Sequence, residues 1–332
     1  MNKGIFIGGN ILTDNVKFVE LYPNKGMLAT IESETLAVGG CVPNTAIDLK
    51  KLDRDLSVKV FGRIGADDKG EYVVSQMYKA GVDTSSVKIS DKYPTSYSDV
   101  ITVKDTGERT FFHNRGANAE FNPNDVDISK LDCDIFHIGY LMLLDYFDKI
   151  DESGITPMSL MLKKIQDKGI KTSIDIVSES SGNFTKVVSA ALPYCNYVII
   201  NEIEACNIVG INARNSNGEL VDDNIKLAMK KIMSYGVKEK TIIHCPEKAF
   251  CLNKDDKFTI VNSIKLKKNF IKGSVGAGDA FCAGALYAIY KEMSDENILS
   301  VGNLTAVNCL SQPDSISGVC SFNDLSKVLE NN

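Results

Sequence analysis

One carboxylate stands inside a stretch of very small residues near the C-terminal end of the chain. Residues 273–284 read GSVGAGDAFCAG, and Asp279 begins an apolar run that is typical of a helix. The backbone N–H groups of Gly276, Ala277 and Gly278 can approach a ligand closely, and successive N–H donors at a helix start form an anion site. Phosphoryl transfer needs such a site together with a base for the nucleophile's proton. Taken alone, the stretch fits a glycine-rich turn with Asp279 as a helix cap equally well.

Two better-known glycine motifs do not explain this stretch. A Walker loop ends in Gly-Lys-Ser or Gly-Lys-Thr, and no such pair follows these glycines. A dinucleotide fingerprint needs a glycine at the sixth position, where counting from Gly276 gives Phe281, and the early GGN at 8–10 fails as well. A dehydrogenase is therefore excluded.

Two other stretches could bind a hydroxylated ligand. In VGGCVPN (38–44), Gly40 lets the backbone approach a ligand, and Asn44 carries an amide that both donates and accepts hydrogen bonds. Asp14 follows the first apolar run and could accept hydrogen bonds from hydroxyl groups. The plainer interpretations are a turn with a capping asparagine and a surface acid.

Asn201 and Glu204 follow the apolar stretch YVII directly. Oxygen-bearing side chains at the end of a strand can hold Mg²⁺ through water, because this ion prefers oxygen ligands and keeps its hydration. A helix start enriched in acids is the alternative, since the helix dipole favours acids there.

Short apolar runs alternate with amphipathic stretches along the chain, and this alternation predicts the strands and helices that position the candidate site residues. The expected strands lie in 4–9, 58–65, 133–139, 171–177, 197–201 and 241–246. The expected helices lie in 44–52, 69–80, 156–168, 186–191, 224–235 and 279–292. The order predicts a mostly parallel sheet covered on both faces by helices.

Two segments, 13–35 and 95–116, break this alternation. Both contain alternating apolar and polar residues without a helical partner, so we expect them to pair into a small separate sheet. Such a sheet would lie over the carboxyl ends of the main strands, where open α/β sheets bind ligands, and would act as a lid. Its exposed edge favours pairing with a second subunit.

The composition is that of an ordinary soluble globular protein. The 332 residues are 44% apolar and 24% charged, and a net charge of −6 offers no electrostatic footprint for nucleic acid or an anionic membrane. The first residues, MNKGIFIGGN, are too short an apolar run for a signal peptide or a membrane span, so we expect a cytoplasmic protein. Nine cysteines without a Cys-x-x-Cys pair are expected to be reduced and buried.

In order and approximate spacing, these stretches resemble the ribokinase-like (PfkB) carbohydrate kinase family over nearly the whole chain. GAGDAF is similar to the second family signature, GGCVPN to the first, and NEIE to the family's Asn-x-x-Glu motif. GRIGADDKG (62–70) and AGVDTS (80–85) add to the resemblance. It implies a three-layer α/β/α core made of 1–12, 36–94 and 117–332, a β lid made of 13–35 and 95–116, and a homodimer formed through the lid.

The implied reaction is transfer of the γ-phosphoryl group of ATP to a hydroxymethyl group of a small sugar, with Mg²⁺. By resemblance Asp279 is the catalytic base, and the amides of Gly276, Ala277 and Gly278 form the anion hole. The residues implied to bind substrate are Asp14, Gly40, Asn44, Arg109 and Asn118. Those implied to bind the nucleotide are Asn201, Glu204, Ser274 and Asn308, with Glu204 holding the metal through water and Asn308 beside the adenine.

Three departures from the family pattern are relevant to these assignments. Gly273 and Ser274 replace the usual Asp-Thr, so activation by potassium stays open, because that aspartate often supports a monovalent-cation loop. The strand at 241–247 lacks its usual glycine, so nucleotide contacts there are expected to differ. The first signature is not lysine-rich, which favours an unphosphorylated acceptor.

The acceptor is not defined by the sequence. Strand alternation places Arg109, His113 and Arg115 on one face of the lid, and an arginine facing the site would favour an acidic sugar. Phe111 and Phe112 are expected to fill the core of the lid; if instead they stack on a base, the protein is a nucleoside kinase. A non-catalytic sugar- or nucleotide-binding regulator is a further alternative, which the presence of Asp279 and its glycines disfavours.

Overall fold

The computed structural model describes residues 3–178, 182–267 and 269–331, and its centre is a nine-stranded sheet. The strand order is β13-β12-β11-β10-β9-β8-β1-β4-β5, parallel from β5 to β11 and antiparallel for β12 and β13. The strands are β1 (Ile5–Gly9), β4 (Val58–Gly65), β5 (Asp83–Ser90), β8 (Ile135–Leu141), β9 (Lys171–Ile176), β10 (Tyr197–Asn201), β11 (Lys240–His244), β12 (Lys248–Asn253) and β13 (Phe258–Asn262).

Helices cover both faces of this sheet. They are α1 (Cys41–Leu52), α2 (Asp68–Lys79), α3 (Pro157–Asp167), α4 (Phe184–Ala191), α5 (Glu202–Val209), α6 (Asp222–Ser234), α7 (Ala277–Tyr290) and α8 (Asp295–Leu310). Successive residues of a strand point to opposite faces, so Ile199 belongs to the hydrophobic core that includes residues of α1, α2, α7 and α8, whereas Val198 and Ile200 belong to the core that includes residues of α3 to α6. Two hydrophobic cores and three layers result, as the sequence predicts.

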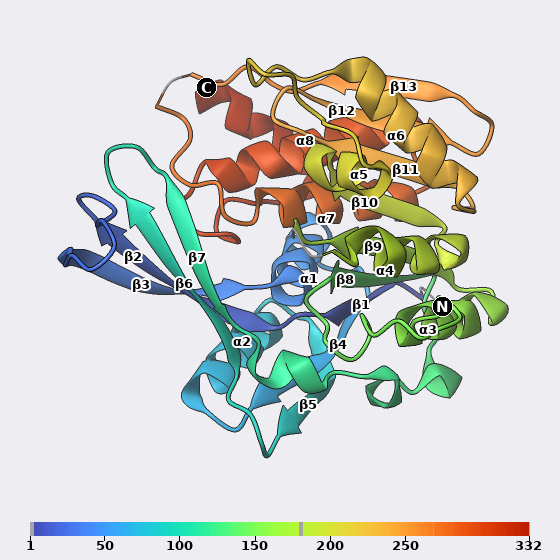
Figure 1. The fold of residues 1–332 in the computed structure, drawn as a ribbon, viewed down its shortest axis with the longest axis horizontal. Helices are drawn as coiled ribbons and strands as arrows, with labels where there is room; N and C mark the ends of the chain where they lie inside the picture. Colours follow the sequence, from blue (N-terminus) through green and yellow to red (C-terminus); the bar gives the residue numbers. More distant parts are fainter. Residues whose placement is uncertain (1–2, 179–181, 268, 332) are drawn as a thin grey trace.

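A second, four-stranded sheet projects from the core (Figure 1). Its order is β3-β2-β6-β7, and it consists of β2 (Leu12–Val19), β3 (Ile31–Gly39), β6 (Ser96–Val103) and β7 (Arg109–Asn114). The two segments that break the alternation of the sequence do pair, through the parallel contact of β2 with β6. The strands extend slightly beyond the expected segments, to Leu12 at the start of β2 and to Gly39 at the end of β3.

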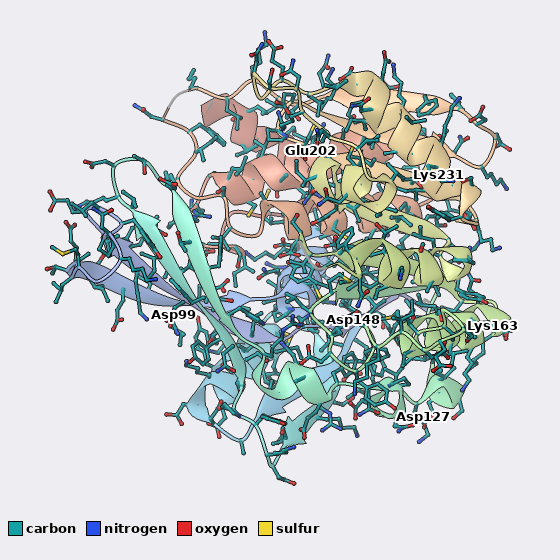
Figure 2. The ribbon with its side chains drawn as sticks, in the orientation of Figure 1. Asp99, Asp127, Asp148, Lys163, Glu202 and Lys231 are labelled. Carbon is teal, nitrogen blue, oxygen red and sulfur yellow. The ribbon has the colours of Figure 1, made fainter. Side chains whose placement is uncertain are left out.

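Charged side chains of both signs are spread over the molecule, from Asp99 on the small sheet to Lys163 on α3 and Lys231 on α6 (Figure 2). Among the residues that the structure describes, no helix has both the length and the apolar composition needed to cross a membrane. All nine cysteines are free, and all except Cys320 are buried, which confirms the expectation of reduced, buried thiols.

Candidate active site

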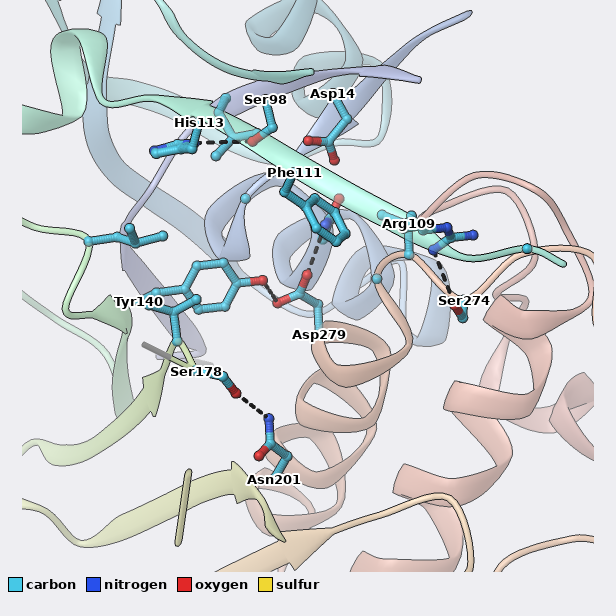
Figure 3. A pocket seen from close by; sticks show the side chains of 18 residues that line it. Asp14, Ser98, Arg109, Phe111, His113, Tyr140, Ser178, Asn201, Ser274 and Asp279 are labelled. Atoms are coloured by element: carbon cyan, nitrogen blue, oxygen red, sulfur yellow. Dashed lines mark hydrogen bonds between the residues drawn. The ribbon is translucent and has the colours of Figure 1, made fainter. Parts of the chain in front are cut away.

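A cavity of about 800 Å³ lies where the small sheet meets the carboxyl ends of the central strands (Figure 3). Its walls come from both sheets and from the N-terminal end of α7. The lining residues include Asp14, Gly40, Asn44, Ser98, Arg109, Phe111, His113, Tyr140, Ser178, Asn201, Ser274, Val275, Gly276 and Asp279. The structure therefore brings together most of the residues that the sequence predicts for acceptor binding and catalysis.

Asp279 is the third residue of α7, and the turn before it requires glycine. Gly276 is the N-cap, with φ at +79°, and a Cβ atom built on it would lie 2.5 Å from the Cβ of Ser315. A side chain there would strain the backbone and clash with its neighbour. The first-turn amides of a helix have no acceptor within that helix, so those of Gly278 and Asp279 are available to an anion, while the Ala277 amide donates a long bond of 3.5 Å to the carbonyl oxygen of Ser274.

Both carboxylate oxygens of Asp279 accept hydrogen bonds from other parts of the chain. The Tyr140 hydroxyl donates to Oδ1 at 2.5 Å, and Asn44 Nδ2 donates to Oδ2 at 2.8 Å. The carboxylate is only 5% exposed, and this burial raises its pKa, while the two hydrogen bonds lower it. A buried base with a raised pKa and oriented oxygens suits proton abstraction near neutral pH.

Asn44 is fixed at both ends of its amide. Its Oδ1 accepts from the Ser315 hydroxyl at 2.9 Å, so the NH₂ end must point towards Asp279. Gly40 precedes α1 with φ at +89°, and a Cβ built there would lie 2.6 Å from the carbonyl oxygen of Asn10. Only glycine permits this approach, and it brings α1 with Asn44 against the site.

Asp14 belongs to a row of polar residues that crosses three strands of the small sheet. The register pairs Asp14 with Ser98, and Ser98 with His113, so all three point to the cavity. The Ser98 hydroxyl lies 3.1 Å from His113 Nδ1. Burial, with a smaller contribution from the Asp279 charge, raises the pKa of Asp14 to about 7, although Ser98 and Arg109 oppose this shift.

Arg109 faces the cavity and Arg115 does not. Arg109 Nη1 donates to the Ser274 hydroxyl at 3.1 Å, and its buried Nε has no hydrogen-bond partner among the described residues. Arg115 instead pairs with Asp145 at 2.9 Å and with the carbonyl oxygen of Met142 at 3.2 Å. The orientation of these two side chains, which alternation could not separate, is fixed by their partners.

The expectation for the two phenylalanines is wrong. Phe111 and Phe112 are 59% and 54% exposed, so neither fills a core of the small sheet. They are on opposite faces of β7, an edge strand, and only one neighbouring strand is available to cover them. The Phe111 ring lines the cavity above Asp279.

A second cavity, of about 470 Å³, adjoins the first. Most of its walls are apolar, and they include His244, Pro246, Ile264, Leu266, Ile271, Phe281, Ala306, Val307 and Leu310. Asn201 and Ser274 line both cavities, while Ala277 and Gly278 face the second. Residues 274–279 therefore separate the first cavity, which has the more polar lining and is called the polar cavity below, from a more apolar one.

Asn308 does not lie in this second cavity. Its Nδ2 donates to the carbonyl oxygens of Leu304 and Leu325 at 2.8 and 3.0 Å, which ties α8 to the C-terminal segment. Asn303, five residues earlier and therefore on a different face of α8, lines the cavity instead. Its buried Nδ2 has no partner in the described part of the chain, so it can donate to a ligand.

Asn201 and Glu204 form a capping box at the start of α5. Asn201 Oδ1 accepts from the Glu204 amide at 2.9 Å, and Glu204 Oε2 accepts from the Asn201 amide at 3.0 Å. Glu204 lines neither cavity, and burial raises its pKa to about 7. The Ser178 hydroxyl donates to Glu204 and accepts from Asn201 Nδ2, so Ser178 and Asn201 present the polar surface in front of this acid.

Asn118 also lies outside the first cavity, which contains Asp14 and Asp279. It is fully buried, and its Oδ1 accepts from the Ile11 amide at 3.2 Å, so it fixes the backbone between β1 and β2. Its place in the sequence, just after β7, suggested a substrate contact. A capping turn buries it instead, behind residues that do line the cavity.

Gly273, where the resembled family has an aspartate, has no room for a side chain. A Cβ built on it would lie 2.6 Å from the carbonyl oxygen of Pro313 and 2.8 Å from that of Gln312. The loop at 312–313 therefore packs directly against the backbone of Gly273, a few residues before the start of α7. The carboxylate that supports a cation loop in that pattern has no counterpart at this position.

Sequence reasoning missed Tyr140, Ser98 and Asn303, and it assigned no ligand contact to His244. Ser98 could have been found from the pairing of two strands, because it is directly opposite Asp14. His244 lines the second cavity with its ring 4.8 Å from that of Phe281, and burial lowers its pKa to about 4. His137 is buried against Ser173, as expected of a structural histidine.

Comparison with known proteins defines the family and the enzyme class of this chain. A family model described as pfkB family carbohydrate kinase matches residues 5–320. The chain therefore belongs to the pfkB family of carbohydrate kinases, and it is a phosphotransferase with an alcohol group as acceptor. The resemblance drawn from the signatures is confirmed.

Three similar proteins show the range within this class. Ribokinase of Schizosaccharomyces pombe is 24% identical over 291 residues, which are 83% of this chain and 82% of that one. The 2-dehydro-3-deoxygluconokinase of Escherichia coli is 23% identical over 277 residues, covering 81% and 86%. The structure of Arabidopsis thaliana ribokinase complexed with ribose and ATP superposes with a TM-score of 0.81 at 19% identity, covering 99% of both chains, and confirms the fold.

Proposed function

We propose that the chain transfers the γ-phosphoryl group of ATP to a hydroxymethyl group of a small unphosphorylated sugar, with Asp279 as the general base. The observation that carries the proposal is the position of residues 274–279 between two cavities. The apolar cavity suits a purine, with Asn303 Nδ2 as a donor to it, and the polar one suits a hydroxylated acceptor. The first-turn amides of α7 lie between them, where the transferred group must pass.

The steps assigned to the protein's own groups follow from this geometry. Asp14 and Asn44 hold hydroxyl groups of the acceptor, and Asp279 takes the proton of the attacking hydroxyl. The amides of Gly276, Ala277 and Gly278 stabilise charge on the transferred phosphoryl group. The small sheet, which consists of residues 12–39 and 96–114, acts as the lid. Its closure excludes water that would otherwise hydrolyse ATP.

Mg²⁺ fits the site as an ion held mainly by ATP and water. No cluster of three or more His, Cys, Asp or Glu side chains is present in the described ranges, so no all-protein metal site is formed there. Ser178 and Asn201 would hold water molecules of the ion, with Glu204 behind them. When bound, the ion supplies positive charge to the phosphate oxygens.

Arg109 favours a sugar acid as the acceptor. It is the sole Lys or Arg side chain among the cavity-lining residues, and a guanidinium in the cavity wall can pair with a carboxylate of the acceptor. Phe111 is the observation that favours the second candidate, a nucleoside, because an exposed ring in the cavity can stack on a base. The test is ADP release with Mg-ATP over a panel of sugar acids, neutral ketoses, pentoses and nucleosides.

The Arg109→Gln variant is expected to raise the KM of a sugar acid by about 10- to 100-fold, the loss expected from one hydrogen bond to a charged group. The KM of a neutral sugar should change by much less, since a neutral acceptor offers the arginine no carboxylate and only the electrostatic interaction of Arg109 with Asp14 is then lost. Arg115→Gln is the matched control, because Arg115 points to Asp145. Equal effects on acid and neutral sugars would contradict the acidic acceptor.

The proposal includes a homodimer formed through the lid. Large apolar side chains are exposed along residues 21–36, namely Leu21, Tyr22, Met27, Leu28, Ile31 and Leu36, and β3 is an unpaired edge. A second copy can cover this surface by the same contacts in both directions. Free cysteines and an ATP donor fit a cytoplasmic location.

Sedimentation analysis is expected to show a dimer that Leu28→Asp converts to a monomer, because a charge would be buried at the contact. Leu227→Asp provides the control, since Leu227 is also exposed but lies on α6, away from the lid. A dimer that survives Leu28→Asp with unchanged affinity would place the contact elsewhere.

A further inference from the structure

The proposed base is held by a tyrosine that no family signature predicts. The Tyr140 ring extends from the end of β8 to Asp279, and its hydroxyl donates to Oδ1 at 2.5 Å (Figure 3). The other oxygen, Oδ2, is held by Asn44 from α1. Asp279 is thus oriented by two neutral donors that come from two separate elements.

The backbone around Tyr140 is fixed on both sides. β8 pairs in register with β1 up to Gly139, whose carbonyl oxygen accepts from the Asn10 amide at 3.0 Å. On the other side the register with β9 shifts between Ile138 and Leu141. Tyr140 lies within this irregularity at the carboxyl end of the strand, which places its side chain in the cavity wall.

The surroundings of Asp279 disfavour its charge. The groups that interact with it electrostatically are Asp14 on β2, Cys41 and Asp48 on α1, Tyr140 on β8, Asp175 on β9, Cys282 on α7 and Cys309 on α8. The charge of Asp279 raises the pKa of each of these groups, whereas the pKa of Asp279 itself is raised by its burial. The pKa of Tyr140 is raised well above 10, so its hydroxyl keeps its proton and acts as a donor throughout the working range.

We propose that Tyr140 is a positioning residue that keeps Asp279 ionised and orients its carboxylate towards the acceptor hydroxyl. This inference rests on the proposed function. Asn44 and Tyr140 both line the acceptor cavity, so the effect of Tyr140 on Asp279 is separated from substrate binding by measuring kcat at saturating acceptor and the titration of Asp279 without substrate.

The Tyr140→Phe variant removes the donor and keeps the ring. The acid limb of kcat, measured with saturating acceptor, is expected to move to higher pH by about one to two units, the equivalent of one hydrogen bond to a charged group. The direction follows because the lost bond favoured the ionised form, so a higher pH is needed to restore it. Turnover should recover at high pH. A uniform loss at all pH values would assign Tyr140 a merely structural role and overturn the proposal.

Replacement of Tyr140 by 3-fluorotyrosine gives a second test of opposite sign. Fluorine makes the phenol a stronger donor and leaves the contact in place, so the acid limb is expected to move to lower pH. Tyr146→Phe is the matched control, because Tyr146 is an exposed tyrosine outside the cavity lining. An acid limb that moves in the same direction in both Tyr140 variants would contradict the assignment.

A measurement without turnover separates this inference from the proposed function. The ¹³C signal of the Asp279 side-chain carboxyl carbon, identified by its absence in Asp279→Asn, reports the titration directly. Its midpoint is expected to rise in Tyr140→Phe and to stay unchanged in Tyr146→Phe. An unchanged midpoint in Tyr140→Phe overturns the inference even if the protein is a kinase. If the midpoint shifts but the protein phosphorylates nothing in the panel, the effect of Tyr140 on the pKa of Asp279 is supported. Only the proposed function is then contradicted.

Discussion

Replacing Asp279 by asparagine is expected to reduce kcat by about 10²- to 10⁴-fold, the usual contribution of a positioned general base. The amide has nearly the same shape, and its one remaining oxygen can accept from Tyr140 or from Asn44 but not from both. It cannot take a proton from the acceptor hydroxyl. Binding of ATP and of the acceptor, measured by calorimetry, should change by less than about threefold, because the lost group acts on the chemical step.

The matched control for this variant is Asp48→Asn. Asp48 is a fully buried acid on α1 that lies outside both cavities, and its pKa is raised well above the usual range by burial. Because a protonated carboxyl and an amide are similar, Asp48→Asn should keep most of the turnover. Near-normal turnover in Asp279→Asn would show that Asp279 is not the general base.

Replacing Asp14 by alanine is expected to raise the KM of the acceptor by about 10²-fold, with a smaller change in kcat. The estimate assumes the loss of one or two hydrogen bonds from acceptor hydroxyls to a charged group, at about 1.5–3 kcal/mol each. The KM for ATP should change little, because Asp14 lines only the polar cavity. Initial rates with either substrate varied against a saturating amount of the other separate the two effects.

The acceptor KM should also depend on pH in the unmodified protein. The pKa of Asp14 is raised to about 7, and the ionised form accepts hydrogen bonds from hydroxyl groups. Binding is therefore strongest above pH 7, and the KM rises as the pH falls through that value. Asp14→Asn should abolish this dependence. An acceptor KM that stays constant from pH 6 to 8 in the unmodified protein would show that Asp14 keeps one protonation state there.

The six central strands of the sheet and the segment around Asp279 could be predicted from local sequence, whereas the strands at its two edges, β5, β12 and β13, were not among those expected. Alternating apolar runs and amphipathic stretches predict the parallel strands and their helices, and the glycines around Asp279 indicate an anion site. Two helices were not among those expected from local periodicity, α5 and α8. α8 carries Asn303, Thr305 and Asn308 at buried positions, so it lacks the clear polar face that periodicity detects.

Contacts between distant segments could not be predicted. Tyr140 is 139 residues from Asp279, and in a strand buried on both faces nothing in the sequence shows which side chain reaches a cavity. Asn303 and Asn308 are equivalent in type and differ only in the helix face they occupy. Alternation predicts one strand face for Arg109 and Arg115, but β7 ends at Asn114, and the positions of Ser274 and Asp145 decide which of the two enters the cavity.

The two adjoining cavities also define how this protein can be inhibited selectively. Asn201 and Ser274 border both, so a single compound that joins an acceptor mimic to an adenosine analogue would pass these two side chains. Joining the halves makes the second binding event intramolecular, and a linker that matches the span gives an effective concentration in the millimolar range. The adenosine half would bind in a pocket of a kind that many enzymes share, so it would add little selectivity. The half that contacts Arg109, Phe111 and Tyr140 would determine selectivity.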